Sequence, residues 1–559
     1  MVAQDGIAGP AAVAGWSEAL GELHERVGHR FARSEARERV KRYLLGLLGR
    51  AERKNGWQLA EAIGERDPQG VQRLLNSAKW DADEVRDDLR SYVVEHLADE
   101  ETGILIVDET GFLKKGERSV GVARQYTGTA GDTVNCQVGV FLAYASKKGA
   151  AFVDRALYLP KAWANDAERR AEAGVPERIV FRNKIELAEL MLERVFASGV
   201  PARWVVADSF YGRSHAFREW LEERQRPYAV MVPKTNSVPL GGRKKKIEQH
   251  VERLPENAWS EVRPARDGGG RRPWEWACLD LAADPEKGMR LWLLVRRSST
   301  DDLEDLGFYQ AYDGPEGTPV EELVRVCQAR WAVEECFAET KGEVGMDHYE
   351  VRRWDAWHRH VTLCLLAHAF LAVTRGAAIE EGGNRKKGDL DPGLIPPTVP
   401  EVRRLVLAMA EPKERRRFLL GWGRRGGGPT RRWRAAAGPP NAPPGELSRQ
   451  GRTTQGRGDP ARRGATHRRA VGVGVSPVAG AEGRRGGQEA APRPPHGVLG
   501  GILWVARTGS SWREMPQEYG KWETAYRRHE LWSKQGLWQR ILRVLGEEDL
   551  PGPATKEPN

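Results

Sequence analysis

Cysteine is scarce in this chain, because only five of its 559 residues are cysteines. Their positions show no paired spacing of the kind that binds a metal ion, and so few thiols do not suggest a disulfide framework. Such a low content is typical of proteins in a reducing compartment. The composition therefore excludes a small disulfide-stabilised secreted domain and gives no indication of a zinc site.

The sequence also lacks long apolar runs. No apolar stretch approaches the roughly eighteen residues that a membrane-spanning helix requires, and the amino terminus carries no charged-then-apolar signal pattern. We therefore expect a soluble, cytoplasmic protein with no membrane partner. A hydrophobic content of 40% still suffices for a sizeable core and excludes a fully disordered chain.

The charges do not balance, since the net charge is +10 at pH 7. A positive excess favours a polyanionic partner such as nucleic acid, although basic surfaces also occur on proteins that bind none. The length allows about two to four domains. Composition alone thus leaves a multidomain protein with a possible nucleic-acid partner, and the motifs decide the rest.

Two acidic residues end two short apolar runs. The runs are Gly103–Asp108 and Arg203–Asp208, which are too short for core helices and rich in β-branched residues. Such runs predict strands buried on both faces. An ionised carboxylate at the edge of a core costs several kcal/mol unless it is paired or metal-bound. Each Asp taken singly could instead be a helix cap or a turn residue.

A third acidic residue, Glu334, lies in a stretch of helix-forming composition. At about 100° per residue, Arg330, Glu334 and Lys341 fall within about 40° of one another on the helix. A solvated stripe of salt bridges would produce the same spacing. Against that alternative, Arg before Glu is the less favourable order, and Val333 and Phe337 indicate a partly buried helix.

The elements around the first two aspartates follow the ribonuclease H-like order, so the expected fold class is α/β. Alternation and helical periodicity predict strands at 133–145 and 150–159, a helix at 183–198, the strand that ends at Asp208, a helix near 214–223 and a strand at 228–232. In this order the third acidic residue comes from the next helix, which is where Glu334 lies.

These residues resemble the DDE transposases of bacterial insertion sequences, specifically their cut-and-paste group. The last motif of that group is Tyr, two residues, Arg, three residues, Glu, six residues and Lys. Arg330, Glu334 and Lys341 fit it without a gap. The stretches Asp108–Gly111 and Ala207–Gly212 are similar to its first and second aspartate motifs.

Further phrases bring the resemblance close to insertion-sequence group seven-oh-one. They are Gln125–Gly128, Lys341–Gly345 and Arg352–Trp354, and the resemblance covers roughly residues 15–435. One departure is visible, because Cys327 stands where the family motif has Tyr. That position is expected to grip DNA rather than to perform chemistry. The departure therefore bears on binding of the element ends more than on catalysis.

The resemblance implies metal-dependent DNA cleavage and strand transfer. It makes Asp108, Asp208 and Glu334 the catalytic residues and the holders of two Mg²⁺ or Mn²⁺ ions, for which oxygen ligands are suited. Arg330 and Lys341 would bind phosphates near the scissile bond.

The implied partners are double-stranded DNA with terminal inverted repeats and a target DNA. A homodimer is expected in the synaptic complex, associated with the nucleoid when bound to DNA. Two other classes stay open: a ribonuclease H-like nuclease without strand transfer, and an impaired fusion that binds element ends as a repressor.

Within a catalytic core expected at 99–376, residues from about 235 to 320 predict a β-rich insertion. In related hairpin-forming enzymes an aromatic residue of such an insertion stacks on a flipped base. Trp292 is the candidate here, with a core Trp as the alternative. A basic run could contact phosphates or be a solvated loop, and it comprises Arg243, Lys244, Lys245 and Lys246.

The remaining segments flank this core. Residues 15–98 predict a helical DNA-binding domain, as a helix-turn-helix or an ordinary bundle, and 377–423 predict a helical extension. The Gly-, Arg- and Pro-rich residues 424–495 predict a disordered linker, with a DNA-touching basic tail as the alternative. Residues 496–548 resemble the amino-terminal module of an insertion-sequence group five transposase. The chain is therefore expected to be a chimera of two elements.

Overall fold

The computed structural model describes residues 10–240, 243–252, 254–262, 274–284, 288–298, 306–314, 318–383, 398–410 and 498–516, with isolated positions between 519 and 538. The chain divides into two compact units, Met1–Leu447 and Ser448–Asn559, which are described separately. The predicted linker at 424–495 lies outside the described residues.

Helices fill the described chain before the first strand. Helices α1 to α5 span Pro10–Gly28, Ser34–Leu48, Gly56–Ala62, Gln69–Asn76 and Ala82–Leu97. The side chains of Asn55 and Asp81 cap α3 and α5 by accepting hydrogen bonds from backbone amides, as short polar residues at helix starts do. The region predicted as a helical DNA-binding domain is thus helical, while its limits and its DNA-binding role stay predictions.

A ten-stranded sheet forms the centre of the first unit, in the order β2-β3-β1-β5-β6-β12-β11-β10-β9, with β4 paired to β3. The first six strands span Ile104–Leu113, Ala123–Thr127, Asp132–Ser146, Gly149–Leu157, Trp204–Ala207 and Tyr228–Met231. Strand β1 runs antiparallel to β3 and parallel to β5, with Val107 opposite Ala207. The predicted α/β class is confirmed, and β5 ends beside the middle of β1.

Short elements join the strands that the sequence predicted. Strand β2 and helices α6 (Lys161–Ala164) and α7 (Ala167–Ala173) were not expected, because each is too short to show clear periodicity. Helix α8 (Lys184–Ala197) lies where a helix was predicted, and Asn183 starts it with a capping box to Glu186. Helices α9 (Ser209–Gly212) and α10 (His215–Glu223) follow β5.

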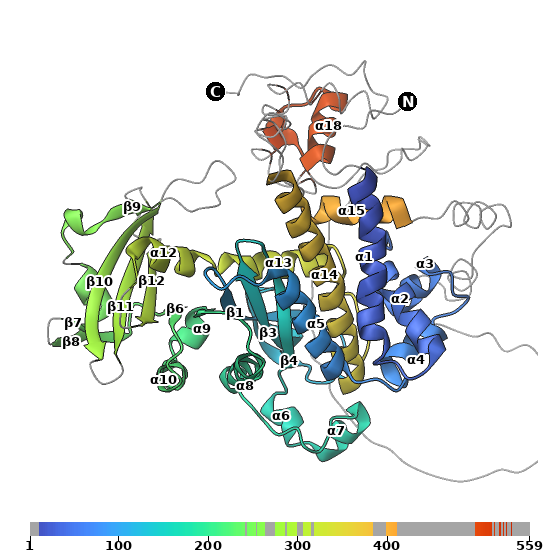
Figure 1. Cartoon of the computed structure of the whole chain (residues 1–559), viewed down its shortest axis with the longest axis horizontal. Coiled ribbons are helices and arrows are strands. Elements are labelled where there is room, and N and C mark those ends of the chain that lie inside the picture. The colour runs from blue at the N-terminus through green and yellow to red at the C-terminus, as the bar shows by residue number, and fades with distance from the viewer. Residues whose placement is uncertain are drawn as a thin grey trace, which may run out of the picture. The chain divides into compact units, whose positions relative to one another are not determined.

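The predicted β insertion continues the main sheet rather than forming a sheet of its own. Strand β12 (Gly307–Asp313) pairs with β6, β11 (Met289–Ser298) with β12, and β10 (Trp274–Asp284) with β11 and β9 (Ser260–Val262). Figure 1 shows these strands side by side at one end. The junction forms because β6 offers an unpaired edge, and the Tyr228 and Tyr312 rings stack across it at 5.6 Å.

Smaller elements complete the insertion. Strands β7 (Ser237–Leu240) and β8 (Arg243–Lys246) form a two-stranded sheet, and the basic run predicted as a phosphate contact is therefore strand β8. Helix α11 spans Ile247–Val251, and a single 3-10 turn spans Glu256–Ala258. No interaction in this part of the described chain brings the basic run to the aspartates.

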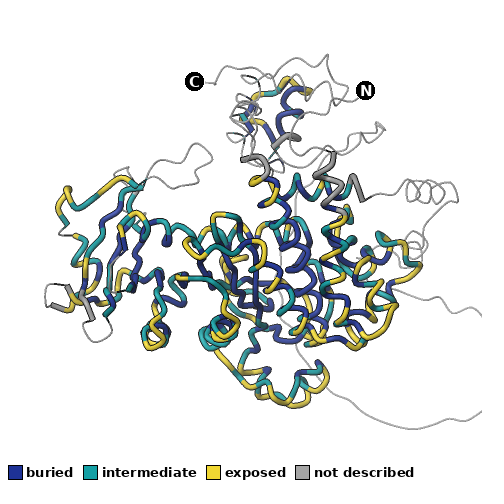
Figure 2. Tube along the Cα trace, in the orientation of Figure 1, coloured by how far each residue is buried: buried dark blue, intermediate teal, exposed yellow. Residues whose placement is uncertain are grey.

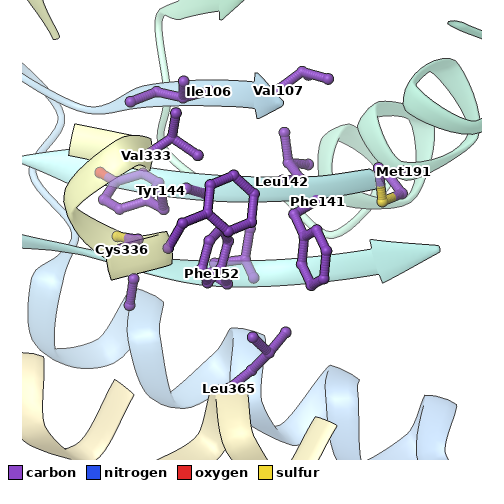
Figure 3. Packing of buried hydrophobic residues seen from close by; sticks show 14 of the residues in the cluster. Ile106, Val107, Phe141, Leu142, Tyr144, Phe152, Met191, Val333, Cys336 and Leu365 are labelled. Carbon is purple, nitrogen blue, oxygen red and sulfur yellow. The ribbon is translucent and has the colours of Figure 1, made fainter. Parts of the chain in front are cut away.

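Helices α12 (Val320–Gln328) and α13 (Trp331–Gly342) return the chain to the half of the sheet that contains β1. Figure 3 shows Val333 and Cys336 of α13 in the same cluster of buried residues as Phe141 of β3 and Phe152 of β4. The Phe337 ring of α13 lies 5.3 Å from Phe141 and 4.9 Å from Phe152. This aromatic packing fixes α13, and hence Glu334, against that half of the sheet.

Helix α14 (Trp354–Gly383) corrects the expectation that no long apolar run exists. Residues Trp354–Glu380 are long and apolar enough to cross a membrane, yet 78% of the apolar window is buried inside the protein. Figure 2 shows buried residues along most of this helix. The sequence from Trp354 through Val373 has a helical, apolar pattern that predicts a helix closing the catalytic core, and α14 packs against α5 and β4.

Helix α15 (Val399–Ala410) lies in the region predicted as a helical extension and packs against α1 and α14. In the second unit, helix α18 (Val498–Thr508) and a 3-10 turn at Trp512–Glu514 are described. A small cluster of its own contains Ile502, Trp512 and Trp538. The domain boundaries drawn from the sequence stay predictions.

Candidate active site

Asp108 and Asp208 come together where β5 ends beside β1. Asp208 follows the last residue of β5, and its neighbour Ala207 is opposite Val107 in the parallel register. The expectation that the first strand ends at Asp108 is wrong, because β1 continues to Leu113. The continuation pairs with β3 alone, after β5 has stopped. Asp108 therefore lies at the end of the parallel pairing rather than at the end of its strand.

Backbone amides hold one oxygen of each aspartate. Oδ1 of Asp208 accepts hydrogen bonds from the amides of Phe210 at 2.9 Å and Tyr211 at 3.4 Å, and thereby caps α9. Oδ1 of Asp108 accepts one from the Glu109 amide at 2.7 Å. The helix-cap alternative is thus present for Asp208, and it leaves Oδ2 available. Neither Oδ2 has a hydrogen bond among the described residues.

The two carboxylates repel each other in a buried setting. Burial, followed by the charge of Asp208, raises the pKa of Asp108 to about 7. Burial, followed by the charge of Glu109, also raises the pKa of Asp208. Arg330 opposes both shifts without cancelling them. The site therefore carries more negative charge than its own side chains neutralise.

Arg330 links this pair to Glu334. Its Nη2 donates to Oε1 of Glu334 at 2.5 Å, and its charge acts on both Asp108 and Asp208. Among the described residues, however, no group of three or more His, Cys, Asp or Glu side chains is placed to hold a metal ion. The structure thus brings two of the three predicted acidic residues together and joins the third to them through Arg330.

Lys341, the last predicted DNA-binding residue of α13, reaches β1. Its Nζ donates to Oγ1 of Thr110 at 2.6 Å and lies 3.4 Å from Oγ1 of Thr129 on the β2–β3 turn. Burial lowers the pKa of this lysine. Arg330 and Lys341 are therefore both anchored near Asp108, one at each end of α13.

The other predicted contacts are not brought to this site. Trp292 lies on β11, which β6 and β12 separate from β5, and its half-buried side chain packs against the core. That placement is nearer to the core-Trp alternative, and base stacking stays a prediction. Cys327 on α12 is buried, so its side chain is not presented to DNA.

Three residues near the aspartates were not singled out from the sequence. Lys184 at the start of α8 donates to Oε1 of Glu109 at 2.7 Å, and Tyr211 is completely buried beside its cap residue Asp208. In the sequence Glu109 is adjacent to Asp108 and Tyr211 lies in the second aspartate motif, whereas Lys184 lies in neither aspartate motif. Nothing in the sequence indicated that residues 109 and 184 meet.

Comparison with known proteins defines the class first. Residues 26–279 match the family described as "DDE superfamily endonuclease", and residues 475–542 match "Putative transposase of IS4/5 family". The chain thus contains one segment that matches a DDE endonuclease superfamily, which is ribonuclease H-like, and one segment that matches a transposase family. These matches confirm the resemblance drawn from the motifs. Endonucleases of this superfamily generally use divalent metal ions.

Two relatives give the particular likeness. The chain is 30% identical over 212 residues to the "Probable transposase for insertion sequence element IS701" of Microchaete diplosiphon, covering 38% of this chain and 51% of that protein. It is 34% identical over 70 residues to the uncharacterized protein y4sN of Sinorhizobium fredii, covering 12% and 52%. The chain thus spans about half the length of each relative.

One solved structure also aligns, an endonuclease V variant of Ciona intestinalis in complex with a DNA that contains an inosine. It is 10% identical, with a TM-score of 0.19, and the alignment covers 46% of this chain and 96% of that one. A similarity this low carries no argument about the present fold or activity.

Proposed function

We propose that this chain is a transposase that cleaves the ends of an insertion sequence and transfers the strands to target DNA. One observation carries the proposal: Asp108 and Asp208 meet at the end of a parallel strand pair with more negative charge than nearby cations neutralise. A structural ion pair would have no net charge. A site that binds a divalent cation would instead carry an excess of negative charge on its own side chains.

The donor set fits a divalent metal ion. Both aspartates offer only oxygen atoms, and in each one oxygen has no hydrogen bond among the described residues, so a hard cation such as Mg²⁺ or Mn²⁺ suits them. When bound, two such ions would activate the attacking oxygen and stabilise the departing one. Asp108 and Asp208 would hold them, with Glu334 as the third carboxylate in the proposed set.

The basic side chains would position the DNA. Arg330 supports this role because its charge already acts on all three carboxylates, and a planar fork can grip a phosphate with two hydrogen bonds. Lys341, fixed against Thr110, would contact a second phosphate. Together they would hold the scissile strand against β1 and exclude alternative registers.

The finer parts of the proposal follow the family. The substrate would be double-stranded DNA with the element's terminal inverted repeats, excised through a hairpin intermediate and joined to a target. A homodimer would assemble both ends, and the protein would act at the nucleoid in the cytoplasm. Trp292, with the run Arg243, Lys244, Lys245 and Lys246, would add contacts from the insertion.

The direct test uses purified full-length protein, Mg²⁺ and a linear DNA that carries the element's own terminal repeat. A denaturing gel should show a 3′ nick and a hairpin with the natural chain, and neither product with Asp108→Asn. Products that persist in the variant would overturn the assignment of Asp108.

A second candidate function is a repressor that binds element ends without cutting them. The pairing of Glu334 with Arg330, rather than with the aspartates, supports it, as does the match of residues 475–542 to a different transposase family. Specific end binding without any Mg²⁺-dependent product in the same assay would favour this function over the transposase.

A further inference from the structure

Two buried polar atoms that lack a well-formed hydrogen bond lie behind the aspartate pair. They are Oε2 of Glu109 and the hydroxyl of Tyr211, and neither has a partner of normal geometry among the described residues. Buried polar groups in folded proteins are nearly always hydrogen-bonded, because an unpartnered one has lost its water without replacement. A pair of them at a candidate active site calls for a functional explanation.

The chain presents these atoms from two elements. Alternation along β1 turns Glu109 to the opposite face from Asp108, toward α8, where Lys184 holds Oε1 at 2.7 Å. Tyr211 lies on α9, whose first amides are held by Asp208. Lys184 therefore fixes one oxygen of Glu109 and leaves the other directed into the protein.

The charges of three carboxylates, Glu109, Asp108 and Asp208, act on the Tyr211 hydroxyl. Its pKa is raised well above the ordinary value, first by burial, then by the charge of Glu109 and a hydrogen-bonding contact with that carboxylate, and then by the charges of Asp108 and Asp208. The contact with Glu109 does not have the geometry of a normal hydrogen bond. Its side chain is fully buried, so no solvent molecule at the surface competes for the hydroxyl. One hydroxyl donor thus lies among three acceptors.

Resting on the proposed function, we propose that Tyr211 and Glu109, with Lys184 behind them, are positioning residues of the carboxylate site. The Tyr211 hydroxyl, next to Glu109, would orient the carboxylates that receive a divalent cation. Glu109 adds a third negative charge next to Asp208, and Lys184 keeps that charge in place. Hydrogen bonds of this kind around metal ligands fix their orientation and raise their affinity.

The same chain contains a matched pair with a purely structural role. The Tyr228 hydroxyl, also fully buried, donates to Oε1 of Glu222 at 2.6 Å and receives a hydrogen bond from Gln310 at 3.1 Å. Tyr228 lies at the amino end of β6, whereas Asp208 follows the carboxyl end of β5. Tyr228 therefore has the chemistry of Tyr211 without its position.

The experiment compares Tyr211→Phe with Tyr228→Phe in the full-length chain, using two measurements: the melting temperature without metal, and the affinity for Mn²⁺ alone by calorimetric titration. Tyr211→Phe should melt at the natural temperature or above, because no well-formed hydrogen bond is lost, while its Mn²⁺ affinity should fall about tenfold. Tyr228→Phe should melt at a lower temperature and bind Mn²⁺ normally. Glu109→Gln should also bind Mn²⁺ more weakly.

Each result points one way. Natural Mn²⁺ affinity in Tyr211→Phe, or a loss of melting temperature like that of Tyr228→Phe, would overturn the positioning role and leave the proposed function standing. If the natural chain itself shows no Mn²⁺ binding that Asp108→Asn removes, the proposed metal site fails, and the positioning role fails with it.

Discussion

Two clusters of buried acidic residues in this protein are balanced in opposite ways. Asp154 of β4 is completely buried, and two arginines face it: Arg194 at 2.9 Å and Arg86 at 3.7 Å. The nearby Asp83 is half-exposed. Its partial burial raises its pKa, but Arg155 and Arg86 outweigh this effect and bring the pKa below its ordinary range. At Asp108 the pKa rises to about 7 instead.

The difference distinguishes buried charges that stabilise the fold from buried charges that are available for chemistry. The Asp154 cluster ties α5, β4 and α8 together with cations that the chain itself supplies. The Asp108 site has one arginine for three nearby carboxylates, since Arg330 also binds Glu334. Proteins seldom leave a buried carboxylate uncompensated unless a ligand completes it.

The largest expected effect separates Glu334 from its neighbour. Glu334→Gln should abolish cleavage while end binding stays measurable, because the charge needed for chemistry is lost and the helix is not. Glu335→Gln, at an exposed position one residue further along α13, should cleave normally and is the matched control. The denaturing gel and a band-shift assay measure the two activities, and cleavage by the Glu334 variant would contradict its role.

The next effect concerns stability. Asp154→Asn should lower the free energy of unfolding by about 3–5 kcal/mol, because it leaves Arg86 and Arg194 with one anion fewer. Its exposed counterpart, Glu193→Gln, breaks a surface pair with Arg224 at 3.1 Å and should change stability by less than about 1 kcal/mol. Urea unfolding measures both. Equal changes in the free energy of unfolding would show that burial does not determine how much the Asp154 cluster stabilises the fold.

A smaller effect appears as a pH dependence of the metal-free protein. The pKa of Asp108 is about 7 in the folded state and about 3.9 in an unfolded chain. Between these pH values the folded state binds more protons, so the free energy of unfolding falls as pH rises. Asp108→Asn should flatten this fall. Urea unfolding with a chelator, at intervals from about pH 4 to 8, tests the sign. An unchanged slope in the variant would contradict the assignment.

The smallest effect concerns DNA affinity. Lys341→Met should weaken binding of any DNA modestly and reduce the slope of log affinity against log salt by about one, as expected for one lost phosphate contact. The control is Lys147→Met, because the exposed ammonium of Lys147 binds Asp99 at 2.8 Å, on a different part of the sheet from the aspartate pair. An unchanged salt slope in Lys341→Met would contradict a phosphate contact.

Much of the site could be predicted because its signals are local. Apolar runs before Asp108 and Asp208 indicate buried strands, and the i, i+4 spacing places Arg330 beside Glu334 on one helix face. The α/β order followed from the same periodicities. Such patterns depend only on which neighbours in the sequence are apolar.

The remainder depends on contacts between distant residues. The continuation of β1 past Asp108 is set by its pairing with β3, and the junction of the insertion is set by β12 meeting β6. The pairing of Lys184 with Glu109 joins residues that are 75 positions apart. Local pattern cannot indicate such meetings, nor could it show that Trp292 is half-buried.

The central claim is that the cationic side chains of the protein do not neutralise the aspartate pair. A thermal melt with and without Mg²⁺ tests this claim most directly. A ligand that binds only the folded state raises the melting temperature. The natural chain should therefore melt higher with Mg²⁺, and Asp108→Asn should melt higher than the natural chain without Mg²⁺ and gain nothing from it. An equal Mg²⁺ shift in both proteins, or none in the natural chain, would contradict the account.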